Sequence, residues 1–222
     1  MKIITVFVVF MLVLFHAIGQ EFKVDVGYKY LYSNQWDKAI QMYNFSRPNL
    51  IEKQPLLMHG LNTSISSIFK STKNVKQGLN VSYSYFRSLA ENENSINLIN
   101  LHFLNMGYML HHENSEKLKG LYTDFMLSVT SSGVFRRLNE APFIYDETQS
   151  KAFGIGGEIN VKCGYYFKLK NKAYFSPYVM CGYTPYLFSP NTEVVINQTK
   201  GLASKNWTSI LTGQVGLAFH LK

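Results

Sequence analysis

The sequence predicts an all-β protein, an eight-stranded antiparallel up-and-down β-barrel that spans a membrane. Three observations support this fold class. Apolar and polar residues alternate with a period of two along most of the chain, several alternating segments are longer than the roughly 5–6 residues usual in globular strands, and the connections between segments differ in length at the two ends. A tilted strand that crosses a bilayer needs about 9–11 residues, which fits these segments.

The N-terminal region has the pattern of a secretory signal peptide. Lys2 precedes an apolar run from Ile3 to Phe15, and the small residues Ala17 and Gly19 precede a cut after Gly19. The run is shorter than the ~20 residues that a transmembrane helix needs. No cysteine follows the cut, so a lipoprotein signal is excluded. We expect residues 1–19 to be a signal peptide and residues 20–222 to form the barrel domain.

Eight alternating segments follow. The clearest is 153–169, where apolar positions such as Ile155 and Val161 alternate with glycine and polar residues. In the segment 97–111, odd- and even-numbered positions are both apolar, and the alternation changes phase near Asn105. This predicts a β-bulge. The predicted strands are 22–32, 59–69, 79–85, 97–111, 121–130, 153–169, 173–184 and 207–221.

The connections alternate between short turns and long loops. Segments 71–77, 112–120 and 170–172 would be turns at one end of the barrel. At the other end, the segment 90–96 is short, and the expected long loops are 33–55, 131–151 and 185–206. Short periplasmic turns and long external loops are typical of outer-membrane barrels. Because the strand number is even, we expect both termini on the periplasmic side.

The alternation has a physical reason. Lipid cannot satisfy backbone N–H and C=O groups, so a spanning sheet must close on itself, with side chains pointing alternately to lipid and to the lumen. Polar positions would then face inward. The charged residues expected in the lumen are Lys23, Asp25, Lys29, Asp124, Glu158 and Lys162, with Lys168 near the end of its strand. Mixed signs in so narrow a lumen favour a plug of ion pairs, and the alternative is a gated narrow pore or a proton path.

The closing segment Leu211–Lys222 alternates most strictly, with Leu211, Val215, Leu217, Phe219 and Leu221 on one face. Together with the signal peptide and the eight-strand pattern, its ending VGLAFHLK resembles small outer-membrane β-barrels of the OmpA/OmpX type, in the form found in Bacteroidota. The terminal Lys222 departs from the aromatic end of many proteobacterial members. The resemblance implies location in the cell outer membrane, contact with its lipid and lipopolysaccharide, and recognition of the last strand by the barrel-assembly machinery. It is a likeness of fold that carries little about function.

Three functions follow from this fold. The first is a non-enzymatic barrel with a structural or interaction role that displays its loops to the exterior. The second is an enzyme that modifies lipid A, for which His59 with Ser46 and Asp37 is the candidate set, although these residues do not match the family motif. The third is a narrow pore. A soluble ligand-binding barrel of the lipocalin kind is the rival at the level of the fold, because alternation alone does not say which face points inward.

The long loops carry the candidate interaction residues. Tryptophan, tyrosine and arginine dominate binding hot spots, so we consider a protein or lipopolysaccharide site there, against the alternative that the first loop packs over the barrel mouth. Arg136 and Arg137 could meet lipid A phosphates. The candidates are Trp36, Tyr43, Phe45, Arg47, Arg136 and Arg137.

The two cysteines of the chain, Cys163 and Cys181, lie on neighbouring predicted strands. A tight turn centred on Lys172 would place them opposite each other, facing lipid. A cross-strand disulfide is then one alternative in the oxidising periplasm, and two free thiols are the other.

The net charge of +8 does not indicate a nucleic-acid-binding protein, because the chain has no basic helical face and no zinc-ligand or RNA-binding motif. We expect no metal and no cofactor.

Overall fold

The computed structural model of the chain describes residues 21–45, 52–56, 59–71, 75–92, 95–113, 120–140, 148–169, 173–190 and 209–221. The predicted signal peptide, residues 1–19, and the last residue, Lys222, lie outside this part of the chain.

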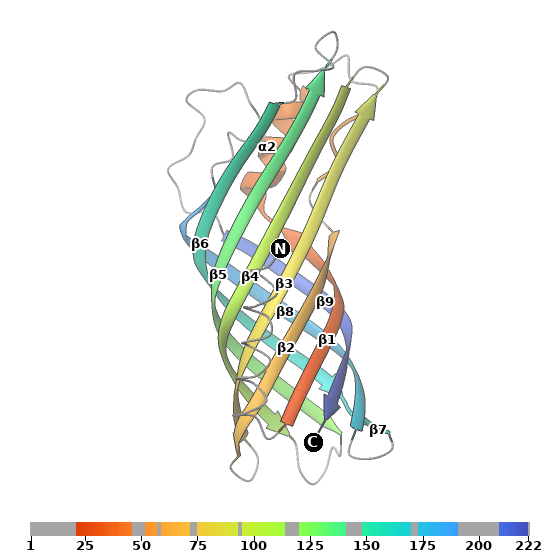
Figure 1. Cartoon of the computed structure of the whole chain (residues 1–222), viewed down its shortest axis with the longest axis vertical. Coiled ribbons are helices and arrows are strands. Elements are labelled where there is room, and N and C mark those ends of the chain that lie inside the picture. The colour runs from red at the N-terminus through yellow and green to blue at the C-terminus, as the bar shows by residue number, and fades with distance from the viewer. Residues whose placement is uncertain are drawn as a thin grey trace, which may run out of the picture.

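Eight long antiparallel strands form one sheet that closes into a barrel (Figure 1). Strands adjacent in the chain pair with each other, the first pairs with the last, and pairing of β6 with β8 completes the ring. A two-residue strand, β7 (Phe167–Lys168), continues β6 beside β8. The predicted eight-stranded antiparallel barrel is therefore confirmed. Its long strands are β1 (Glu21–Tyr32), β2 (His59–Ser71), β3 (Val75–Asn92), β4 (Ser95–Glu113), β5 (Leu121–Glu140), β6 (Thr148–Tyr165), β8 (Ala173–Phe188) and β9 (Ser209–Leu221).

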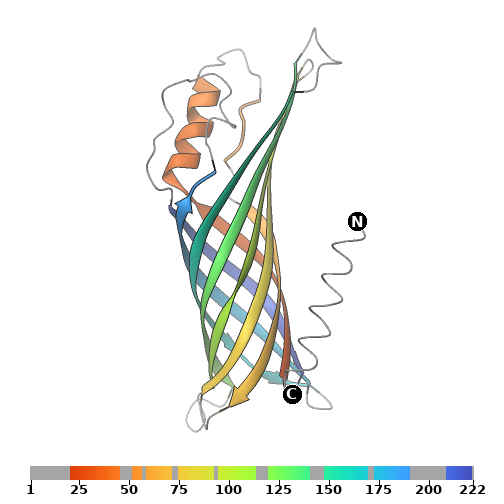
Figure 2. The same ribbon diagram turned by 60° about the vertical axis from the view of Figure 1, so that its left-hand side comes forward.

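Strands β3 to β6 are longer than the rest and rise above the barrel as a curved wall (Figure 2). They have 18 to 20 residues, against 12 in β1 and 13 in β9. Pairing of β2 with β3 stops at Phe86, and pairing of β6 with β8 stops at Ile155, so the four strands pair only with one another beyond these points. The prediction of a loop at 131–151 was wrong for residues 131–140 and 148–151. Continuous pairing of β5 with β4 and with β6 holds these residues in strands.

The predicted phase shift in 97–111 was also wrong. Strand β4 pairs with both neighbours without a register shift at Asn105. Its odd-numbered residues face inward throughout, and these include Ile99, Leu101 and Phe103 as well as Asn105. Inward- and outward-facing residues of β4 are both apolar here, because the upper interior of the barrel is itself apolar.

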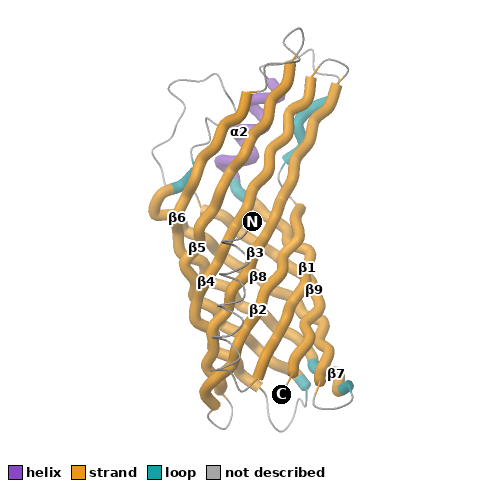
Figure 3. Tube along the Cα trace, viewed as in Figure 1, coloured by secondary structure: helices purple, strands orange, loops and turns teal. Residues whose placement is uncertain are grey.

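A helix, α2 (Asn34–Phe45), follows β1 where the sequence predicted a long loop. It lies at the wide end of the barrel, against the inner side of the wall (Figures 2 and 3). The side chains of Trp36, Ile40 and Tyr43 are buried, at the spacing of one helical face. This helix, the one helix in the described part of the chain, is neither long nor apolar enough to cross a membrane.

The continuous register of β4 predicts how single cysteines placed along it should react. In a background in which Cys163 and Cys181 are serine, Leu101→Cys should resist a small maleimide in detergent, because Leu101 is fully buried. The matched variant Leu104→Cys should react quickly, because Leu104 is 42% exposed on the outer face. Mass spectrometry of the labelled protein measures both, and faster labelling at position 101 would contradict the register.

Candidate functional site

Buried ion pairs cross the lower half of the barrel interior, the half nearer the start of β1 and the end of β9 (Figure 1). Lys23 on β1 pairs with Asp124 on β5, which lies on the opposite side of the ring, and both side chains are fully buried. Lys162 on β6 lies 2.5 Å from the Asp25 carboxylate and 4.0 Å from that of Asp124. Two ammonium groups thus meet two carboxylates, so the cluster is charge-compensated.

Neighbouring groups complete the surroundings of these charges. The Ser64 hydroxyl donates to the Asp25 carboxylate at 2.6 Å. The Lys23 ammonium lies 4.4 Å from the centroid of the Tyr122 ring, and that of Lys162 lies 4.5 Å from the Tyr178 ring. Each cation therefore has an aromatic face as well as a carboxylate. Buried charges are tolerated when they are paired in this way.

A further pair marks the middle of the lumen. The Lys29 ammonium lies 3.0 Å from the Glu158 carboxylate, with both side chains almost fully buried. It is also 6.0 Å from the centroid of the Phe103 ring. Phe103 belongs to the apolar cluster above. This pair therefore lies between the apolar upper interior and a lower interior that holds the ion pairs. The lower interior also contains a second apolar cluster, made of Ile68, Met109, Met126, Tyr178, Met180 and Ala218.

Aromatic and histidine side chains fill the lower end. The Tyr166 hydroxyl lies 3.0 Å from Nε2 of His111 and 3.3 Å from Nδ1 of His220. The Tyr122 ring stacks on that of Tyr166, with centroids 4.6 Å apart. Nδ1 of His111 contacts the Asp124 carboxylate at 2.5 Å. The ring cluster is thus joined to the ion pairs above it.

The rim below this cluster is held by one lysine between two glutamates. The Lys76 ammonium lies 2.7 Å from the Glu21 carboxylate and 3.1 Å from that of Glu113. These residues come from β3, β1 and β4, so the contact ties three strands at the lower rim.

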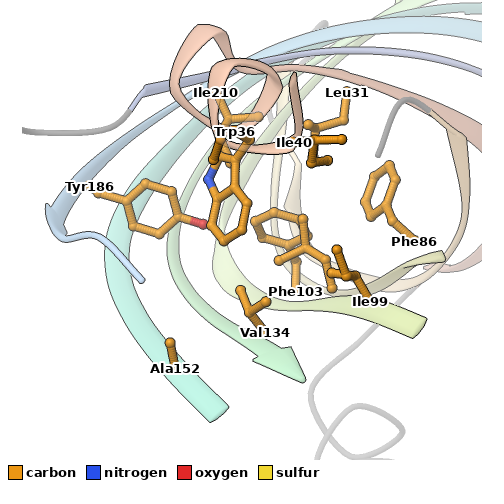
Figure 4. Close-up of a cluster of buried hydrophobic side chains, with 12 residues drawn as sticks. Leu31, Trp36, Ile40, Phe86, Ile99, Phe103, Val134, Ala152, Tyr186 and Ile210 are labelled. Atoms are coloured by element: carbon orange, nitrogen blue, oxygen red, sulfur yellow. The ribbon is translucent and has the colours of Figure 1, made fainter. Parts of the chain in front are cut away.

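The upper interior is closed by α2. Figure 4 shows Trp36 reaching from the helix into an apolar cluster, toward Tyr186 and Val134. The buried face of the helix packs on residues of the wall and of the barrel mouth. Further members of the cluster are Leu31, Ala39, Ile40, Phe86, Ile99, Leu101, Phe103, Ala152 and Ile210.

Polar contacts fix the helix and the following segment to the wall. Nε of Arg136 donates to Asn97 at 2.9 Å, and the guanidinium lies 5.2 Å from the centroid of the Tyr43 ring. The Asn97 amide donates to the Gln54 side chain at 2.9 Å, and the Gln54 amide donates to the Ser88 hydroxyl at 2.6 Å. Helix, segment 52–56 and wall are therefore one hydrogen-bonded unit.

A second contact anchors the end of the helix. Asn44 donates to the backbone oxygen of Gln54 at 2.9 Å and accepts from its backbone N–H at 2.7 Å. In the first turn, burial raises the pKa of Asp37 above its ordinary value.

The structure places the sequence-predicted residues in three groups. Six of the seven charged residues expected in the lumen turn inward and are buried, whereas Lys168 is exposed, because Tyr166 interrupts the strand and breaks its alternation. Of the candidate interaction residues, Trp36, Tyr43 and Arg136 are also buried, and Trp36 and Tyr43 fit the alternative in which the first loop packs over the barrel mouth. They point inward because the helix and the wall pack face to face. Phe45 is 89% exposed and Arg137 is exposed, whereas Arg47 lies outside the described residues.

The predicted pairing of the cysteines was wrong. Cys163 pairs with Val179 and Cys181 with Val161, and both thiols are free and exposed. The link between β6 and β8 centres one residue earlier than Lys172, as the pairs of β7 with Phe175 and Tyr174 show. This shifts the expected register by two residues.

The histidine considered for lipid chemistry does not meet catalytic partners. His59 lies exposed, with its ring 5.9 Å from that of Tyr28 and 5.7 Å from that of Tyr30, both on the outer face. Ser46 lies outside the described residues, and Asp37 lies on α2. Within the described ranges, no group of three or more His, Cys, Asp or Glu side chains could hold a metal ion.

Sequence reasoning missed the aromatic and histidine cluster of the lower lumen. It ended the predicted strand at His111, whereas β4 continues to Glu113 and buries the His111 side chain completely. Tyr122 and His220 occupy inward positions of their alternating strands, so the alternation of inward and outward residues, applied strictly, would have placed both in the lumen. Tyr166 lies between β6 and β7, outside both strands, so the alternation along a strand does not predict where its side chain points.

No protein-family model matches the chain, and no curated protein matches it. Among solved structures, it is similar to Ail, the attachment invasion locus protein of Yersinia pestis, with 9% identity, a TM-score of 0.48, and coverage of 92% of this chain and 100% of that one. It is also similar to Neisserial surface protein A (8% identity, TM-score 0.45, 91% of this chain and 96% of that one). A third similar structure is the N-terminal β-barrel domain of OprF from Pseudomonas aeruginosa (10% identity, TM-score 0.45, 91% and 98%). The function therefore has to be inferred from the residues of this chain.

Removal of one carboxylate from the central ion pairs tests their energetic role. Asp124→Asn should lower the free energy of unfolding by about 3–5 kcal/mol, because it leaves Lys23 buried without its carboxylate. The double variant Lys23→Met/Asp124→Leu should recover most of this loss. Urea titration in phospholipid vesicles, followed by the mobility of unboiled samples on gels, measures the stability.

Glu52→Gln is the matched control, because Glu52 is exposed. It should change stability by less than about 0.5 kcal/mol. An equally small effect of Asp124→Asn would contradict a structural role for the buried pairs.

Proposed function

We propose that this protein is a non-enzymatic outer-membrane barrel with a filled lumen, whose role is to hold a wall and a helical cap outside the membrane for structural or interaction purposes. One observation carries the proposal: the outer face is apolar on every long strand, while charged residues are buried in the lower interior. Soluble proteins rarely expose so large an apolar surface. We call this outward-facing apolar surface the apolar belt. One exposed residue from each long strand, in chain order, illustrates it: Val26, Leu61, Leu79, Leu104, Leu127, Ile159, Val179 and Val215.

The same observation argues against a soluble barrel of the lipocalin kind. Such a barrel would line its interior with apolar residues and turn its polar residues to water. Here Lys23, Asp25, Asp124 and Lys162 are buried in the lower interior, and the opposite parity is exposed and apolar. A lipid environment accounts for both faces at once.

Aromatic residues lie at the two limits of the belt. Near the lower limit, the rings of Tyr165 and Phe167 are 5.1 Å apart, and those of Phe175 and Phe219 are 5.6 Å apart. Toward the upper limit, Phe135 and Phe153 meet edge to face at 5.8 Å. Girdles of aromatic residues at both interfaces are typical of outer-membrane barrels and support this placement.

The orientation and assembly of the barrel form part of the proposal. β1 begins and β9 ends at the lower end, opposite the wall (Figure 1), which supports periplasmic termini and an external wall. In the small barrels of OmpA/OmpX type, and in their Bacteroidota form that this chain resembles, the barrel-assembly machinery reads the last strand. Leu211–Lys222 would serve here, and its strand β9 pairs with β1 from Phe22 to Tyr32.

A filled interior favours an interaction role over a narrow pore. Ion pairs occupy the lower lumen, and the apolar cluster with α2 occupies the upper lumen. The wall and the cap then remain as the surfaces for a protein partner, with exposed Phe45 at the end of α2.

Introduction of arginine into the belt tests the membrane assignment. Val161→Arg should reduce the folded fraction strongly, because an arginine facing lipid near mid-depth costs about 2–4 kcal/mol. Met42→Arg is the matched control, because Met42 is an exposed apolar residue of α2 outside the belt. The wild type and Met42→Arg should float with vesicles in a density gradient and run differently on gels before and after boiling. Equal folding of all three proteins, or recovery of the wild type in the soluble periplasm, would contradict the proposal.

A further inference from the structure

A groove of about 460 Å³ lies on the outer face of β3 to β6, near the upper limit of the apolar belt. Aromatic and polar side chains share its lining, and none of its ten lining residues is acidic. Leu104 continues the lining into the apolar belt. The residues that matter for its chemistry are Tyr83, Asn100, His102, Gly133, Phe135 and Phe153.

The groove exists because one residue lacks a side chain. A Cβ atom at Gly133 would lie 2.9 Å from the Phe135 ring and 3.4 Å from the Phe153 ring. Any larger side chain at position 133 would therefore occupy the space between the two rings.

The polar groups of the groove are arranged as donors. The Tyr83 hydroxyl lies 2.6 Å from Nδ1 of His102, and when it donates there, the neutral imidazole carries its proton on Nε2. The Asn100 oxygen accepts from the Tyr85 hydroxyl at 2.9 Å, which leaves the NH₂ group of Asn100 as a donor. The remaining donors suit an oxygen acceptor of a ligand, beside the aromatic rings of the groove.

Two cations flank the groove in one row at its upper edge, and a third exposed cation, Arg137, lies one outward position above Phe135. Register places Arg87, Asn100, Phe135 and Lys151 in one row across the four strands. Arg87 and Lys151 are exposed, and a separation of three strands sets them about 14 Å apart. Below this row the outward residues line the groove and then continue into the apolar belt at Leu104 and Ile155, so the cations lie where lipid phosphates would be.

We propose that this groove and its two cations bind a lipid of the outer leaflet, a diphosphorylated and acylated disaccharide of the lipid A type. An acyl chain would lie in the groove against Phe135 and Phe153, and the two phosphates would meet Arg87 and Lys151. The separation of Arg87 from Lys151, with the third cation Arg137 on the strand next to Lys151, favours a ligand with two phosphates over a lipid with one. The inference rests on the proposed membrane location, and it adds a binding site that the location alone does not require.

The test is titration of the purified full-length barrel with lipid A in detergent micelles, followed by native mass spectrometry. Arg87→Gln/Lys151→Gln should weaken binding at least about tenfold, because each charge-assisted contact to phosphate is lost. Gly133→Leu should weaken it without any change in charge, because it fills the groove. Lys38→Gln/Lys168→Gln is the control: it removes two exposed cations far from the groove and should bind like the wild type.

Parallel measurements separate the site from the fold. Every variant should keep the gel shift on boiling, which reports an intact barrel. If the wild type shows that shift and floats with vesicles but binds lipid A no better than phosphatidylglycerol, the lipid A site is wrong and the membrane barrel stands. Equal loss in the control pair would likewise overturn the site, because it would show a general charge effect. If the wild type does not insert into vesicles at all, the proposed function fails first.

Discussion

Closure of the sheet is the constraint on which the rest of the structure depends. Pairing of β1 with β9 and of β6 with β8 leaves each long strand with a neighbour on both sides over the barrel. A closed ring forces each side chain to point either outward or inward, which is why the sequence alternates so strictly. A slip of one residue in β1 would turn Lys23 and Asp25 toward the outer face and bring Val24 into the lumen, so the charges also fix the register.

The interior must then be filled, and the chain does so in two different ways. Below the Lys29–Glu158 pair, carboxylates and ammonium groups compensate one another across the ring. Above it, apolar side chains of the wall pack against α2. The ion pairs of the lower half determine which strands face each other across the ring. The apolar side chains of the upper half hold α2, which is not part of the sheet. Arg136 is a buried charge within this upper packing, where it donates a hydrogen bond to Asn97 and lies 5.2 Å from the centroid of the Tyr43 ring.

The sequence predicted what depends on local alternation. The eight strands, their inward charges and the outward apolar face all follow from parity. The helix was missed although Trp36, Ala39, Ile40 and Tyr43 have helical spacing, because the segment was treated as a connection. The upper strands 131–140 and 148–151 could not be predicted in this way. Their SSGVFRR pattern suggests a turn, and only pairing with β4 and between β5 and β6 keeps it extended. The burial of Arg136 likewise needs Asn97 and Tyr43, which come from distant parts of the chain.

The claim that the lumen is filled is the one most open to direct measurement. The purified barrel, shown to be folded by its gel shift on boiling, should be added to planar lipid bilayers under an applied voltage, together with Glu158→Gln. We expect no steady ion-selective current from either protein, because buried ion pairs and the packed cap occupy the interior. A steady selective current in the wild type that Glu158→Gln alters would contradict the account and would make the charged interior a conduction path.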